Sequence, residues 1–318
     1  MQTWYKKSCV KIPDMAFNVV FMGSPEFALP VLRALITQYL IIGVVTQPDK
    51  PAGRGQVMTP PPVKKLAIEL NLPYIQPRRL REPEAKDQLK AWNPDLIVVA
   101  AFGQILRLEV LDLPRFGCIN VHASLLPRWR GAAPIQAAIV NGDPFTGVTI
   151  MRMDPGVDTG PILSQHQIPI DPEDTTGTLS ERLSVLGAEL LLDTLPGYIR
   201  GELDPQPQDE TLALRAPMLK KEDGELDFNQ PAAVLERKVR AFNPWPGAFT
   251  YWQGELFKVH RAQVHDYENA VPGKSYRIDQ WPAYGTAQGL LILDEVQPAG
   301  RKSMPGELFL RGARDWGN

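Results

Sequence analysis

Cysteine and histidine are scarce in this chain. Of 318 residues, two are cysteine and four are histidine. Cys9 and Cys118 lie far apart and outside any metal-ligand spacing, so the sequence indicates neither a disulfide framework nor a zinc site, and we expect no bound metal. A chain without disulfides fits a reducing compartment, and we expect the protein in the cytoplasm.

Long apolar runs and a charge excess are also missing. No apolar run reaches the roughly 18 residues that span a bilayer, so we expect no membrane segment. Residues 1–14 contain lysines but not the apolar core of a secretory signal, and we interpret them as an extension ahead of Met15. The net charge of −2 is not that of a typical nucleic-acid binder, so any contact with nucleic acid must come from local patches.

What the sequence does contain is an alternation of strand and helix patterns up to about residue 205. Apolar, β-branched runs at 17–23, 40–46 and 95–103 are typical of strands buried on both faces of a sheet. Helical periodicity lies between them and continues in a last long helix that ends at Gly201. This alternation predicts a Rossmann-like open α/β domain with a mostly parallel sheet over residues 15–205.

The residue composition and the secondary-structure pattern change after that domain. Residues 206–232 are polar and contain proline, as in a linker. From 233 to 318 one helical stretch is followed by short strand-like pieces that glycine, proline and asparagine turns separate. The length suits two domains, and we expect the second to be a small, OB-like β-barrel.

A segment rich in proline and glycine, residues 47–62, follows the second strand. These residue types predict a long loop without regular structure. Lys50 and Arg54 within it have the charge to contact phosphates. The alternative is a solvated connection, but unstructured loops beyond about 12–15 residues tend to be lids, binding loops or disordered segments, which favours a function.

Asn120 and His122 stand at the end of a predicted strand. Because side chains alternate along a strand, both point to the same face, and ligands bind beyond the carboxyl ends of strands in open α/β sheets. An amide and an imidazole there could stabilise a negatively charged oxygen. The alternative is a buried structural histidine with an asparagine neighbour.

Asp158 lies between Gly156 and Gly160 in a loop after another predicted strand. The glycines give the backbone freedom to aim a carboxylate at a site. A carboxylate beside an imidazole makes a pair that can handle protons. The alternative is an aspartate that only shapes a turn.

A long string resembles the folate-dependent formyltransferase family. It is INVHASLLPRWRGAAPIQAAIVNGD at 119–143, followed by TGVTIMRMDPGVDTG at 146–160. The resemblance implies that Asn120, His122 and Asp158 form the catalytic set. It also implies 10-formyltetrahydrofolate as the formyl donor, no metal, and a folate-contacting segment of Ser124, Leu125, Leu126 and Pro127.

Four further strings resemble the methionyl-tRNA formyltransferase branch of that family: FMGSPEFA at 21–28, VVTQPDKPAGRG at 44–55, LKKEDGELDF at 219–228 and VRAFNPWPGA at 239–248. The resemblance implies transfer of the formyl group to the α-amine of methionyl-initiator tRNA for translation initiation. Lys50 and Arg54 would meet the tRNA acceptor end. Lys220 and Lys221 would extend the contact toward a tRNA-binding second domain, and we expect a monomer.

Two alternatives stand beside this interpretation. One is a formyltransferase acting on a small amine such as an amino-sugar nucleotide, which can also carry a small second domain. The other is a nicotinamide-dependent dehydrogenase or a non-catalytic Rossmann module. The first strand ends in MGSPEF without the G-x-G-x-x-G of dinucleotide binding, and Asn120, His122 and Asp158 are all present, which disfavours this second class.

Overall fold

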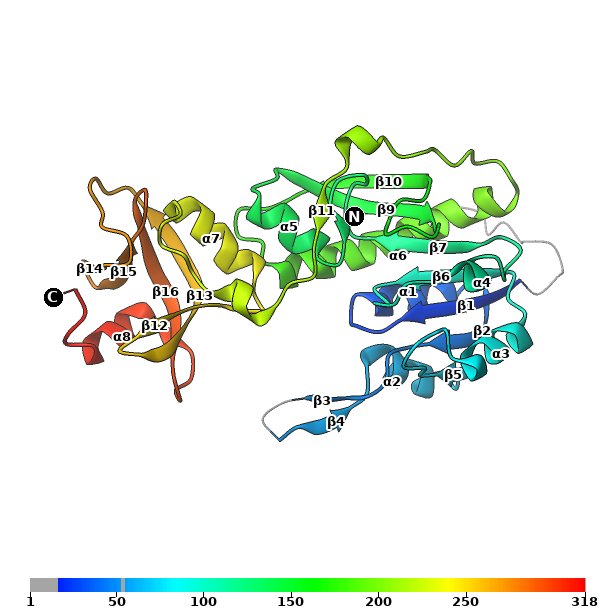
Figure 1. The fold of residues 1–318 in the computed structure, drawn as a ribbon, viewed down its shortest axis with the longest axis horizontal. Helices are drawn as coiled ribbons and strands as arrows, with labels where there is room; N and C mark the ends of the chain where they lie inside the picture. Colours follow the sequence, from blue (N-terminus) through cyan, green and yellow to red (C-terminus); the bar gives the residue numbers. More distant parts are fainter. Residues whose placement is uncertain (1–16, 53–54, 318) are drawn as a thin grey trace, which may run out of the picture.

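A computed structural model describes residues 17–52 and 55–317 of the chain (Figure 1). The expected N-terminal extension and Arg54 therefore lie outside the described residues. Two sheets lie at opposite ends of an elongated molecule, and helices α5 (Pro134–Val140) and α7 (Ala232–Ala241) lie between them (Figure 1).

The larger sheet has seven strands in the order β10-β9-β7-β6-β1-β2-β5. The run from β7 to β5 is parallel, whereas β9 and β10 pair antiparallel. Their bounds are β1 (Asn18–Gly23), β2 (Leu40–Val45), β5 (Tyr74–Ile75), β6 (Leu96–Ala100), β7 (Cys118–His122), β9 (Phe145–Arg152) and β10 (Ile162–Pro169). The sheet confirms the prediction of a mostly parallel, Rossmann-like domain, with strands between the helical segments as the apolar runs required.

Helices cover both faces of this sheet, and the two faces have separate cores. The first core holds side chains of α1 (Ala28–Leu35), α2 (Pro62–Glu69), α5 and α6 (Thr176–Ile199). The second holds side chains of α3 (Pro83–Trp92) and α4 (Leu108–Leu111). In β7, Ile119 and Val121 belong to the first core and Cys118 to the second. Asn120 and His122 therefore face the side of the sheet that carries α3 and α4.

The prediction that residues 47–62 lack regular structure was wrong. Strands β3 (Lys50–Ala52) and β4 (Val57–Thr59) form an antiparallel hairpin in this segment, which projects away from the main sheet (Figure 1). Proline is compatible with such a ribbon because each strand has a free edge, where a missing N–H leaves no ladder bond unmade. Pro51 pairs with Met58 in register within it.

The second sheet is antiparallel and fits the predicted small barrel. Its order is β12-β13-β16-β15-β14, and β17 pairs with β16. The bounds are β12 (Ala248–Trp252), β13 (Glu255–His265), β14 (Ser275–Ile278), β15 (Trp281–Gly285), β16 (Leu290–Pro298) and β17 (Met304–Pro305), with α8 (Gly306–Gly312) at the end. Phe257, Phe309 and Trp316 pack together in its core.

Regular structure also occurs between the two sheets. Strand β11 (Arg215–Ala216) pairs in parallel with β8 (Arg130–Gly131), and two short 3-10 turns, η1 (Glu210–Leu212) and η2 (Lys221–Gly224), lie on either side of β11. At the end of α7, Phe242 packs into the first core of the larger domain. Within the described ranges, no helix combines the length and apolar character that crossing a bilayer requires.

Candidate active site

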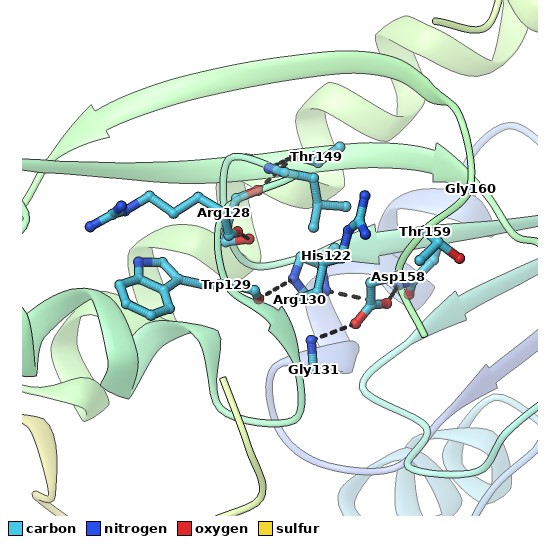
Figure 2. A network of polar contacts seen from close by, with 12 residues as sticks. His122, Arg128, Trp129, Arg130, Gly131, Thr149, Asp158, Thr159 and Gly160 are labelled. Carbon is cyan, nitrogen blue, oxygen red and sulfur yellow. Dashed lines mark hydrogen bonds and ion pairs between the residues drawn. The ribbon is translucent and has the colours of Figure 1, made fainter. Parts of the chain in front are cut away.

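Three polar side chains meet at the carboxyl end of β7. Asn120 and His122 are buried, with 8% and 6% of their surface exposed. Asp158 reaches them from the loop between β9 and β10 (Figure 2). The structure thus brings together the three residues that the sequence singled out, at the strand edge where open α/β sheets bind ligands.

The carboxylate of Asp158 is the centre of this group. Its Oδ1 accepts a hydrogen bond from Asn120 Nδ2 at 3.3 Å and lies 3.6 Å from His122 Nδ1. Its Oδ2 accepts from the backbone N–H of Gly131 at 2.9 Å. These contacts fix the direction in which the carboxylate points, and Figure 2 shows it facing the imidazole ring.

The other ring nitrogen of His122 is also engaged. Nε2 lies 3.1 Å from the backbone carbonyl oxygen of Trp129. A carbonyl oxygen can only accept, so the proton of a neutral ring belongs on Nε2. Nδ1 then turns toward the Asp158 carboxylate, and that contact is favourable when a further proton lies between them. The geometry therefore places the carboxylate next to the ring nitrogen with which it could exchange a proton.

Trp129 is held in place by the turn that follows β7. Its φ of 63° is in the left-handed region, which aims its carbonyl at His122. Ser124 Oγ donates to the carbonyl of Arg128 at 2.6 Å, and the Trp129 indole donates to Asp143 at 2.7 Å. The side chain of Arg128 stacks on the indole at 4.6 Å. Side-chain contacts thus fix a backbone carbonyl at the site.

The segment predicted to contact folate, from Ser124 to Pro127, is tied to the neighbouring strands. Thr149 Oγ1 donates to the Ser124 carbonyl at 2.6 Å and accepts from the Leu126 N–H at 3.1 Å. The side chains of Ser124 and Leu126 are buried, whereas Leu125 and Pro127 are partly exposed. These two hydrogen bonds tie the segment to β9, while Leu125 and Pro127 keep part of their surface exposed.

A cationic cavity of about 290 Å³ opens between the segments that follow β5 and β6. Five of its lining side chains are basic: Arg78, Arg79, Arg81, Lys86 and Arg107. Val110 also lines it and belongs to the same core as Cys118, so the cavity lies on the face of the sheet that carries Asn120 and His122. Its charge suits an anionic ligand.

The residues predicted to meet tRNA lie apart from this centre. Lys50 is exposed on the projecting hairpin, in strand β3. Lys220 and Lys221 are exposed at η2, and Lys220 places its backbone N–H on Asp223. Arg54 lies outside the described residues. Lys50, Lys220 and Lys221 are thus exposed to solvent, where a large ligand could contact them outside the buried group of Asn120, His122 and Asp158.

The structure also shows residues at the site that the sequence analysis did not single out. Trp129 and Gly131 contact His122 and Asp158, and both lie inside the string that carried the family resemblance. Gln208 contacts the Asp158 loop from 50 residues along the chain, and no local pattern marks it. In the part of the chain that the structure describes, no group of three or more metal-ligating side chains could hold an ion.

Comparison with known proteins identifies the family of both parts of the chain and solved structures with the same fold. The formyl transferase family matches residues 17–195, and the formyl transferase C-terminal domain matches residues 218–314. The solved N-formyltransferase of Helicobacter canadensis, in complex with folinic acid and dTDP-3-aminofucose, has a TM-score of 0.66 at 16% identity, covering 89% of this chain and 100% of its own. HypX of Aquifex aeolicus with tetrahydrofolic acid has a TM-score of 0.63 at 18% identity, covering 93% and 47%. These two structures share the fold.

Two relatives that are much closer in sequence are both methionyl-tRNA formyltransferases. The methionyl-tRNA formyltransferase of Chloroflexus aggregans is 47% identical over 299 residues, which cover 93% of this chain and 97% of the relative. That of Geobacter sulfurreducens is 47% identical over 93% of this chain and 94% of its own. Since the identity extends through both domains, the chain belongs to the methionyl-tRNA formyltransferase family.

Proposed function

We propose that this enzyme transfers the formyl group of 10-formyltetrahydrofolate to the α-amine of methionyl-initiator tRNA, giving N-formylmethionyl-tRNA for translation initiation in the cytoplasm. The observation that carries the proposal is the convergence of Asn120, His122 and Asp158 on one point of the sheet edge. The enzyme acts as a monomer and needs no metal. Residues 15–205 catalyse, 206–232 connect, and 233–318 bind tRNA.

In the proposed reaction the uncharged methionyl amine attacks the formyl carbon, and a negatively charged oxygen develops there. Asn120 uses one amide N–H on Asp158 and has a second for this oxygen. His122, protonated at Nδ1 and Nε2, adds positive charge beside it. Asp158 orients His122 and relays the proton from the amine toward the departing folate nitrogen.

The cationic cavity supports a folate as donor. A folate ends in a glutamate with carboxylates, and the five basic side chains supply the opposite charge. Among the described residues that line the cavity, Glu109 is the one acid, and it is paired with Lys86 at 2.9 Å. The segment from Ser124 to Pro127, which follows His122 closely in the chain, would contact the same ligand closer to His122.

The projecting hairpin supports a contact with the acceptor end of the tRNA. Lys50, in strand β3 of this hairpin, supplies a positive charge for that contact. Replacing Lys50 by alanine is expected to raise KM for the charged tRNA roughly fivefold, on the order of 1 kcal/mol. The slope of log KM against log salt should fall by about one, because one phosphate contact is lost. Steady-state kinetics at several salt concentrations measure both effects.

Lys65 provides the matched control for this variant, because it is an exposed lysine on α2 of the same domain. Lys65→Ala should keep the normal KM for tRNA. Equal behaviour of the two variants would remove Lys50 from the tRNA contact. Arg54, Lys220 and Lys221 complete the proposed tRNA-contacting set, and each can be compared in the same assay.

The rival substrate class is an amino-sugar nucleotide, such as the one in the Helicobacter canadensis structure. Formyl transfer from 10-formyltetrahydrofolate to charged methionyl-initiator tRNA and to dTDP-3-aminofucose, measured side by side, separates the two. We expect rapid transfer to the tRNA and none to the sugar. If only the sugar were formylated, the proposed catalytic residues would stand, but the proposed acceptor would change from the tRNA to an amino-sugar nucleotide.

A further inference from the structure

The chain that leaves the larger domain crosses back over the catalytic loops. We call residues 206–216 the strap. At its start, Gln206 and Ile162 exchange backbone hydrogen bonds of 2.8 Å. Near its end, Arg130 N–H donates to the Leu214 carbonyl at 2.8 Å, and β11 pairs with β8. The strap is thus fixed at both ends, one beside the loop of Asp158 and one beside the turn after β7.

One strap side chain bonds directly to the Asp158 loop. Gln208 Nε2 donates to the backbone carbonyls of Asp158 at 2.9 Å and Gly160 at 2.7 Å. Its Oε1 accepts from Arg130 Nε at 2.9 Å. A single amide therefore uses both of its N–H groups on one catalytic loop and its oxygen on the turn that carries Trp129 and Gly131.

The hydrogen-bond partner of Gln208, Arg130, is itself held by an ion pair with Glu210. The Arg130 side chain is only 7% exposed, and its two terminal N–H₂ groups donate hydrogen bonds to the Glu210 carboxylate at 2.8 and 2.7 Å. Hydrogen bonds from Arg130 hold the pKa of Glu210 below its usual value. A planar, bidentate pair fixes the guanidinium, and hence the Nε that Gln208 accepts from.

The Asp158 loop needs such support. Asp158 has a φ of 54°, a left-handed conformation that is uncommon for a residue with a side chain. At Gly160 a Cβ would lie 1.9 Å from the Arg152 carbonyl oxygen, so the backbone passes tightly against β9. A backbone in an unfavourable conformation persists when surrounding contacts determine it, and Gln208 supplies two of those contacts.

We propose that Gln208 is a positioning residue: with Arg130 and Glu210 behind it, it holds the Asp158 loop so that the carboxylate stays within reach of His122. This inference rests on the proposed function. Without the two amide bonds the carboxylate would lose its alignment, and a displacement on the order of 1 Å can cost about 100-fold in rate. The loss should fall on kcat, with KM for both substrates little changed.

Two variants of the same residue test this role, and a neighbour serves as control. Gln208→Ala removes the amide, whereas Gln208→Glu keeps the size and the acceptor for Arg130 but loses the donors. Each is expected to lower kcat roughly 10- to 100-fold. Gln206→Ala is the matched control, because that side chain bonds only to Asp204 within the described part of the chain. It should behave as the unaltered enzyme.

A double variant shows whether Gln208 acts through Asp158. If it does, Gln208→Ala combined with Asp158→Asn is no slower than Asp158→Asn alone, because the aligned carboxylate is already gone. Losses that multiply would overturn the inference, and so would a normal kcat in both Gln208 variants.

A readout without substrates separates this inference from the proposed function. The ring ¹⁵N resonances of His122 should change in Gln208→Ala and Gln208→Glu and stay fixed in Gln206→Ala, because the carboxylate beside Nδ1 moves only in the first two. Unchanged His122 resonances in both Gln208 variants would overturn the positioning role even in an active enzyme. Absence of tRNA formylation by the unaltered enzyme would instead overturn the function and leave this result standing.

Discussion

Replacing Asp158 by asparagine is expected to lower kcat by about 1,000- to 10,000-fold. The amide has nearly the same size but no charge, so it can neither pair with a protonated His122, now 3.6 Å away, nor take a proton from the amine. It would also present an N–H₂ group where Oδ2 now accepts from Gly131 or where Oδ1 faces His122. Single-turnover kinetics at saturating donor measure the chemical step itself.

Asp193 offers the control for this variant. It is an exposed aspartate on α6, away from the site, and Asp193→Asn changes the net charge equally. It should leave kcat unchanged. If Asp158→Asn stayed within about tenfold of the normal rate, the carboxylate would not be the proton-handling group, and the mechanism proposed for the pair would be wrong.

Asn120→Ala is expected to lower kcat by about 100- to 1,000-fold, the usual effect of losing one donor to a developing oxyanion. KM should change little, because this hydrogen bond strengthens only as the tetrahedral oxygen forms. The Asn120 amide also donates to Asp158 Oδ1, so part of the loss comes through that carboxylate.

Combining Asn120→Ala with Asp158→Asn separates the two contributions of the amide. An oxyanion donor adds a further loss in the double variant, whereas an amide that only orients Asp158 adds none. Near-normal activity of Asn120→Ala by itself would discard the oxyanion role.

The sequence predicted the parts of the site that local chemistry determines. Asn120 and His122 share a face because strand side chains alternate, and the buried run before them identified the strand. The pairing of Asp158 with them could be predicted only through the family resemblance. Asp158 comes 38 residues after Asn120 and depends on a left-handed backbone that spacing does not reveal.

Other features depended on contacts between distant segments. The prolines of residues 47–62 indicated a loop, yet a two-stranded ribbon accommodates Pro51 at its edge. Residues 206–216 are polar and therefore resembled a plain linker. Their bonds to Asp158, Gly160 and Arg130 join segments about 50 to 80 residues apart in the sequence, which no local periodicity can indicate.

The central claim is that this chain formylates the initiator species of methionyl-tRNA. The measurement that tests it most directly is kcat/KM for formyl transfer from 10-formyltetrahydrofolate to charged initiator tRNA and to charged elongator methionine tRNA, with the formyl group located on the methionine α-amine. The account predicts efficient transfer to the initiator and little to the elongator. Equal transfer to both tRNAs, or turnover of the folate with neither as acceptor, would contradict it.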